Sequence, residues 1–202
     1  MPHPLLLVHG FLSTRSAMHP LARHFRRAGR TVDRARLSPL CIQDVRALAV
    51  QVGRSVEALQ QATGAEQVDL VGVSQGGLAA LYYVRRLGGA ERVRRMVALG
   101  TPFAGTWFAA VGVPLLGAVS AGVWQSLPGS DLVKELAAAG PALGEDVVSI
   151  ARQGDTVAPP ERCRLEGARN IVLPGRRTPW AHQTMGVSRA VALAALDALD
   201  AP

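Results

Sequence analysis

Aromatic residues are scarce in this chain of 202 residues: only 4% are Phe, Trp or Tyr, although 49% are hydrophobic. The apolar content is therefore mainly Ala, Val and Leu, which suits a buried parallel sheet between Ala-rich helices better than a β-sandwich. The length is sufficient for one substantial core and short for two. We expect a single α/β domain over residues 1–202.

Cysteine is represented only by Cys41 and Cys163, which form neither a metal-ligand pattern nor a CxxC redox pair. Their spacing leaves open whether they pair with each other. The acidic residues form no run of oxygen ligands that would suit Ca²⁺. These absences give no support to a metalloenzyme or a thiol-dependent enzyme, and we expect neither a metal nor a cofactor.

Lysine is almost absent, since Lys134 is the only one, and the formal charge of +7 comes from arginine. The arginines gather in two stretches, residues 23–30 and residues 85–95. Stacking aromatic residues and groove-reading modules are missing there, so we do not expect nucleic acid as a partner. A solvated surface explains the charge, and attraction to anionic lipid surfaces remains open as a peripheral contact.

A secretory leader is also missing from the sequence as given. The chain enters the apolar run Leu5–Val8 almost at once, without a basic region or a cleavage-like site before it. We therefore expect a cytoplasmic protein, while the oligomeric state stays undetermined.

Short apolar runs alternate with segments of helical periodicity along most of the chain. This alternation predicts a parallel sheet of about six strands with helices on both faces, the architecture of an α/β fold. The expected strands are Leu5–Val8, Thr31–Leu37, Val68–Val73, Val93–Leu99, Val147–Ala151 and Asn170–Leu173. The expected helices are Ser16–Ala28, Asp44–Ala62, Gly76–Leu87 and Val187–Leu199.

The segment from Phe103 to Ser130 interrupts this alternation, because it is apolar, rich in glycine and uncharged. Its length suits a transmembrane helix, but Pro114, several glycines and scattered polar residues argue against one. An ordinary buried helix pair is a second alternative. We favour a cap over an apolar site and assign residues 103–140 to it.

A GxSxG pattern stands between a predicted strand and a predicted helix, in the run Gly72-Val73-Ser74-Gln75-Gly76. A serine on so tight a strand-to-helix turn has its hydroxyl held out of the sheet edge. The helix that follows directs its N-terminal amides toward negative charge forming on a substrate. Ser74 is therefore the candidate nucleophile.

A serine nucleophile needs a base and an acid that orients the base. Asp155 follows the predicted strand Val147–Ala151, and His182 lies in a loop beyond the last predicted strand. Because parallel strands place their carboxyl ends at one edge, Ser74, Asp155 and His182 can converge there. Asp131 is the competing acid, since it follows the candidate cap.

The oxyanion of an acyl transfer needs hydrogen-bond donors. The first predicted strand ends in His9-Gly10-Phe11, where the glycine permits a sharp turn. The backbone amides of Phe11 and Gln75 are our candidates for this role, and His9 is expected to support the geometry of the loop.

Together these segments resemble the α/β-hydrolase lipases and esterases, particularly small bacterial lipases. The similarity runs over nearly the whole chain and rests on six motifs in order: LLLVHGF, LVGVSQGGLAA, LGTPFAGT, LPGSDLVKEL, GDTVAPP and WAHQTM. The resemblance implies a triad of Ser74, Asp155 and His182 and an oxyanion hole at Phe11 and Gln75. Ala181 replaces the glycine that usually precedes the family's catalytic histidine.

The sequence thus predicts a serine-dependent hydrolase of carboxylic esters with apolar acyl groups, acting on a small-molecule or lipid ester. An acyl-thioesterase or acyltransferase with the same triad is one alternative, and a non-catalytic lipid- or membrane-binding module is another. The candidate acyl-chain surface consists of the large apolar residues in the cap, namely Phe103, Trp107, Phe108, Leu115, Leu116 and Trp124.

Overall fold

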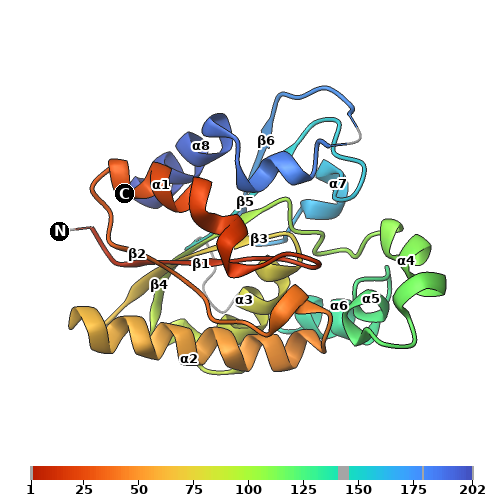
Figure 1. The fold of residues 1–202 in the computed structure, drawn as a ribbon, viewed down its shortest axis with the longest axis horizontal. Coiled ribbons are helices and arrows are strands. Elements are labelled where there is room, and N and C mark those ends of the chain that lie inside the picture. Colours follow the sequence, from red (N-terminus) through yellow and green to blue (C-terminus); the bar gives the residue numbers. More distant parts are fainter. Residues whose placement is uncertain (1, 141–145, 179, 202) are drawn as a thin grey trace.

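Six parallel strands form one sheet in the computed structural model, which describes residues 2–140, 146–178 and 180–201 (Figure 1). The strand order is β2-β1-β3-β4-β5-β6, and every neighbouring pair is parallel. The predicted fold class is confirmed. The strands are β1 (Leu5–Val8), β2 (Val32–Arg34), β3 (Val68–Val73), β4 (Val93–Leu99), β5 (Val147–Arg152) and β6 (Arg169–Leu173).

Strand β2 is shorter than the predicted run Thr31–Leu37. It lies at the edge of the sheet and pairs only with β1, itself four residues long. The paired register ends at Leu7 and Arg34, because an edge strand extends only as far as its single partner provides backbone groups to bond.

Helices cover both faces of the sheet (Figure 1). Helices α1 (His19–Arg27) and α8 (Arg189–Asp200) lie on one face, and α2 (Val45–Thr63) and α3 (Gln75–Arg86) lie on the other. Successive side chains of a strand point to opposite faces. Accordingly, Leu5 and Leu7 pack with α1 and α8, whereas Leu6 and Val8 pack with α2 and α3.

The connection from β4 to β5 contains α4 (Phe108–Leu116), α5 (Ala121–Gln125) and α6 (Asp131–Ala138). These three helices lie toward the carboxyl edge of the sheet, on the right of Figure 1. Within the described ranges, no helix is long and apolar enough to cross a membrane. The segment from Phe103 to Ser130, for which a single transmembrane helix was one alternative, instead contains the two short helices α4 and α5, of nine and five residues. The short helix α7 (Pro160–Cys163) follows β5.

One arginine of the basic stretches is not on a solvated surface. Arg30 is buried, and its guanidinium donates to Asp69, which Arg94 also binds at 2.8 Å. A buried carboxylate is stable as an anion only when cations or hydrogen-bond donors surround it. This cluster joins the loop between α1 and β2 to the amino-terminal ends of β3 and β4, opposite the edge that carries the predicted site.

Candidate active site

Ser74 lies between β3 and α3 with a strained backbone, at φ 54° and ψ −129°. Such a conformation persists in a residue other than glycine only where the surroundings enforce it. A side chain at position 76 would meet the carbonyl oxygens of Val8 and His9 at 2.5 Å, and one at position 72 would meet the Gly77 backbone. The small residues of the GxSxG pattern thus allow β1, the turn and α3 to pack closely.

Thr101, in the loop directly after β4, supports this turn. Its buried hydroxyl donates to the backbone carbonyl of Ser74 at 3.0 Å. The Ser74 amide in turn donates to the carbonyl of Leu99 at the end of β4. This role of Thr101 was not predicted from the sequence, although the residue stands in the LGTP motif directly after a predicted strand.

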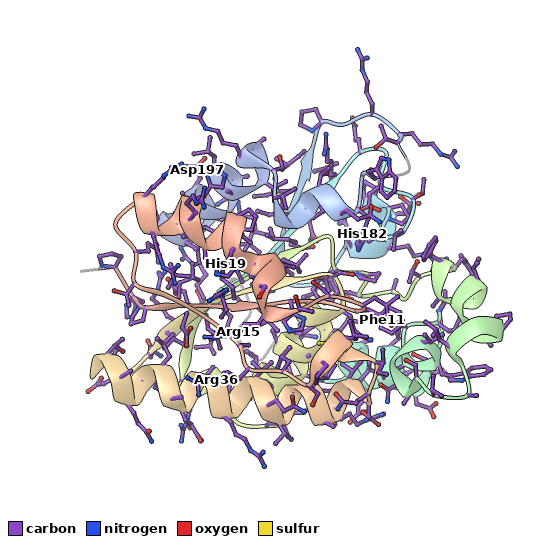
Figure 2. The ribbon with its side chains drawn as sticks, viewed as in Figure 1. Phe11, Arg15, His19, Arg36, His182 and Asp197 are labelled. Carbon is purple, nitrogen blue, oxygen red and sulfur yellow. The ribbon has the colours of Figure 1, made fainter. Side chains whose placement is uncertain are left out.

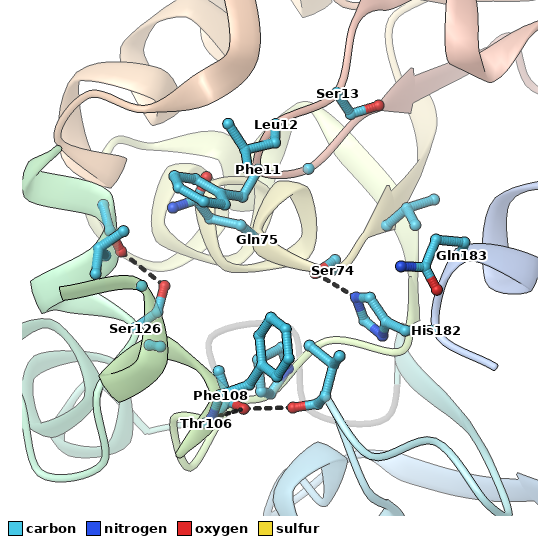
Figure 3. A pocket seen from close by; sticks show the side chains of 18 of the residues that line it. Phe11, Leu12, Ser13, Ser74, Gln75, Thr106, Phe108, Ser126, His182 and Gln183 are labelled. Carbon is cyan, nitrogen blue, oxygen red and sulfur yellow. Dashed lines mark hydrogen bonds between the residues drawn. The ribbon is translucent and has the colours of Figure 1, made fainter. Parts of the chain in front are cut away.

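The structure brings Ser74, His182 and Asp155 together in a chain of hydrogen bonds. Nε2 of His182 lies 2.8 Å from Oγ of Ser74, and Nδ1 of His182 lies 2.8 Å from Oδ2 of Asp155. Figure 3 shows the imidazole beside the Ser74 hydroxyl. The three residues come from the ends of β3 and β5 and from the loop after β6, so the topology assembles them.

Both carboxylate oxygens of Asp155 have hydrogen-bond partners. The side chain is fully buried, and Oδ1 accepts the amides of Val157 and Ala158 at 2.9 Å each. Hydrogen bonds to a carboxylate are strong and directional, so these two amides fix the orientation of the Asp155 side chain. Oδ2 is thereby left to face the imidazole. The competing acid Asp131 is instead exposed at the start of α6.

The loop after β1 approaches the nucleophile turn closely. A side chain at position 10 would meet the carbonyl oxygen of Val73 at 2.7 Å and the amide nitrogen of Gln75 at 3.3 Å. In the described part of the chain, neither the Phe11 amide nor the Gln75 amide donates a hydrogen bond to a protein group. Both predicted oxyanion donors therefore lie at this junction and are free to bind a ligand oxygen. Figure 2 shows Phe11 and His182 at the same end of the molecule.

His9 lies beneath this loop, buried against Cys41. Its Nδ1 is 3.4 Å from Sγ of Cys41. Burial lowers the pKa of His9, opposed by a smaller effect of the Gly10 carbonyl, and burial raises the pKa of the Cys41 thiol to about 12. Both groups are thus neutral packing elements. Cys41 and Cys163 are free thiols and do not pair.

A cavity of about 580 Å³ opens beside Ser74 and His182. Its volume is in the range of small-molecule sites. Most of its described lining is apolar, and none of it is Asp, Glu, Lys or Arg (Figure 3). The apolar side chains are those of Phe11, Leu12, Ala17, Met18, Val73, Pro102, Phe108, Ala109, Val111, Leu116, Val123, Val157 and Val187.

Only part of the predicted acyl-chain surface lines this cavity. Phe108 and Leu116 do so. Phe103 instead belongs to the core beneath the sheet and is 6% exposed. Trp107 and Trp124 point outward and are 66% and 50% exposed. Trp107 stacks with Arg162, and the Trp124 indole donates to the Gly117 carbonyl.

The prediction was therefore wrong for Phe103, Trp107 and Trp124. Leu115 lies in α4, but its side chain is outside the part that the structure describes. Four valines that were not predicted also line the cavity, namely Val111, Val123, Val157 and Val187.

Metal ligands are not gathered at this site. Throughout the ranges that the structure describes, no group of three or more His, Cys, Asp or Glu side chains is placed to hold a metal ion.

Comparison with known proteins identifies the fold. Residues 48–115 match the family model described as the alpha/beta hydrolase fold. The chain is similar to a Bacillus licheniformis lipase, BlEst2 in its mature form, with a TM-score of 0.79 at 18% identity over 96% of this chain and 92% of that one.

Two further solved structures are similar at comparable identity. The product of a Listeria innocua gene has a TM-score of 0.72 at 17% identity over 99% of this chain and 94% of that one. Aspergillus fumigatus lipase B has a TM-score of 0.76 at 16% identity over 99% of this chain and 53% of that one. This chain has the α/β-hydrolase fold, which is the fold that the resemblance noted from its motifs implies.

Proposed function

We propose that this α/β-hydrolase-fold chain is a serine-dependent carboxylic ester hydrolase of the lipase and esterase type, with Ser74, His182 and Asp155 as its catalytic residues. The observation that carries the proposal is the chain of two 2.8 Å hydrogen bonds from Ser74 through His182 to the buried Asp155. Ser74 and His182 line a cavity whose other lining residues are mainly apolar. Similarity to solved lipases supports the same reading.

The geometry suits acyl transfer in two steps. In the first step, Nε2 of His182 accepts the Ser74 proton while Oγ attacks the ester carbonyl carbon. The carbonyl oxygen becomes an oxyanion facing the amides of Phe11 and Gln75, and Asp155 stabilises the imidazolium through Nδ1–H. Collapse of the intermediate breaks the C–O bond, and the alcohol leaves with the proton from His182.

The second step uses water in place of the serine. His182 removes a proton from the water, which attacks the acyl-enzyme carbonyl through the same oxyanion site. The carboxylic acid leaves, and the proton returns to Ser74. Each step reuses the same groups, so the whole cycle needs no group beyond the triad and the two amides.

The apolar cavity predicts a preference for acyl groups of medium length. Each methylene buried there contributes about 0.8 kcal/mol, or about fourfold in kcat/KM where the acyl chain fits. We therefore expect 4-nitrophenyl hexanoate to exceed 4-nitrophenyl acetate in kcat/KM by about tenfold or more. The measurement is an ester chain-length series.

A matched pair of α4 variants tests whether this cavity sets the preference. Ala109 is buried and lines the cavity, whereas its neighbour Ala110 is exposed and does not. Ala109→Phe is expected to reduce hexanoate turnover much more than acetate turnover, and Ala110→Phe is expected to change neither. If the wild type hydrolyses the acetate ester as well as or better than the hexanoate ester, the predicted preference for acyl groups of medium length is wrong.

Thioesters and amides belong in the same series. The triad and oxyanion donors do not distinguish an oxygen ester from a thioester, so this comparison decides the leaving-group class. A preference for hexanoyl thioesters over oxygen esters would replace the ester hydrolase by a thioesterase with the same catalytic residues.

A further inference from the structure

The loop that carries the Phe11 amide is hydrogen-bonded to the segment of residues 40–45. The amide of Leu12, next to Phe11, donates to the carbonyl of Leu40 at 2.7 Å. Leu12, Leu40 and Cys41 all have left-handed backbones, with φ of 51°, 62° and 49°. None of them is a glycine, so their conformation is strained and depends on neighbouring contacts to persist.

Helix α5 supplies contacts that hold the 40–45 segment. The hydroxyl of Ser120 donates to the carbonyl of Ile42 at 2.7 Å, and the Gly122 amide reaches the same carbonyl at 3.4 Å. Oε1 of Gln125 accepts the Val45 amide at 2.7 Å. A side chain at position 122 would meet the Gln43 carbonyl at 2.9 Å, so α5 lies directly against the segment.

A continuous path of hydrogen bonds and strained backbone therefore runs from α5 through the 40–45 segment to the oxyanion loop. Helix α5 is also part of the cavity wall, through Gly122 and Val123. Among the described residues, the Phe11 amide donates no hydrogen bond to the protein, and its neighbour Leu12 is the residue bonded to the segment.

We propose that Ser120 and Gln125 are positioning residues for the oxyanion site, because they fix the strained 40–45 turn that orients the Phe11 amide. This inference rests on the proposed function, in which that amide stabilises the tetrahedral intermediate. An oxyanion donor works only within a narrow range of distance from the developing charge. A relaxed turn moves the donor away and raises the barrier without weakening substrate binding.

Ser130 provides a closely matched control. Ser120 caps α5, accepting the Val123 amide at 3.3 Å and donating at 2.7 Å. Ser130 caps α6 in the same way, accepting the Val133 amide at 3.3 Å and donating at 2.7 Å. Its acceptor is the Gln125 carbonyl within the cap, and not the 40–45 segment. Both Ser→Ala variants lose a helix cap, but only Ser120→Ala loses the bond to Ile42.

The experiment measures kcat and KM for 4-nitrophenyl hexanoate and the affinity for butylboronic acid. The boronate forms a tetrahedral adduct with a serine and places an oxygen toward the oxyanion donors. We expect Ser120→Ala and Gln125→Leu to lose about tenfold in kcat. Boronate affinity falls in parallel, and inhibition by the product hexanoate changes less than about twofold.

The controls separate positioning from stability. Ser130→Ala is expected to stay within about twofold of the wild type in all three quantities, and Ser120→Thr, which keeps a hydroxyl, to recover most of kcat. If Ser120→Ala does not fold, Gln125→Leu gives the same comparison. Equal losses in Ser120→Ala and Ser130→Ala, or a rise in KM at constant kcat, would overturn the inference.

The wild type distinguishes this inference from the proposed function. If the wild type neither hydrolyses the ester nor binds the boronate, the proposed function fails. If the wild type does both and the α5 variants match Ser130→Ala, only the positioning role fails.

Discussion

Ser74→Ala is expected to reduce kcat/KM for 4-nitrophenyl hexanoate by roughly a millionfold, the effect typical of losing a serine nucleophile. The variant is expected to remain folded, because the hydrogen bond from Thr101 reaches the backbone carbonyl at position 74 and not the side chain. Steady-state kinetics and thermal unfolding of the same preparation measure both effects.

Ser188→Ala is the control for this substitution. Ser188 precedes α8, makes no side-chain cap bond and does not line the cavity. Its variant is expected to retain wild-type turnover. Turnover of folded Ser74→Ala above about 1% of the wild type would show that another group attacks the ester, since nucleophile removal costs far more than that.

Asp155→Asn is expected to reduce kcat by about ten-thousandfold. The amides of Val157 and Ala158 hold the acceptor side of residue 155. An asparagine would therefore keep its oxygen on those amides and turn its NH₂ toward Nδ1 of His182. The imidazole would then carry its proton on Nε2 and donate to Ser74, instead of accepting the proton from it.

Asp131→Asn distinguishes the two candidate acids. Asp131 is exposed at the start of α6, so its substitution is expected to leave kcat within about twofold of the wild type, as for most surface changes. The same kinetic assay serves both variants. Loss of turnover in Asp131→Asn with retention in Asp155→Asn would assign the acid to the other position.

The convergence of Ser74, Asp155 and His182 could be predicted because it follows from topology. Parallel strands end at one edge, and each of these residues comes after a strand whose apolar run is plain in the sequence. The two hydrogen bonds between them then depend on local turns, and some of these turns have a sequence signature, such as the glycines around Ser74.

The cavity wall could not be predicted in the same way. A helix shows which side faces solvent through its charged residues, and the segment from Phe103 to Ser130 has none. Without that marker, the sequence predicts only that the largest apolar residues face the cavity. The structure turns Trp107 and Trp124 outward, where each has a polar partner, and fills the wall with smaller side chains.

The contacts that hold the oxyanion loop could not be predicted from the sequence either. Thr101, Leu40 and Ser120 act through contacts between loops far apart in the chain. The left-handed backbones at Leu40 and Cys41 have no sequence signal, because these residue types rarely adopt that conformation. Their geometry arises from tertiary packing and becomes visible only in the assembled structure.

Labelling with a fluorophosphonate tests the central claim most directly, namely that the Ser74 hydroxyl is an activated nucleophile. Incubation of the folded protein, followed by peptide mass spectrometry and a turnover assay, gives the position of the adduct and its effect together. We predict one adduct, on Ser74, formed in proportion to the loss of ester turnover and absent after unfolding. An unmodified Ser74, or full turnover by protein labelled at Ser74, would contradict the account.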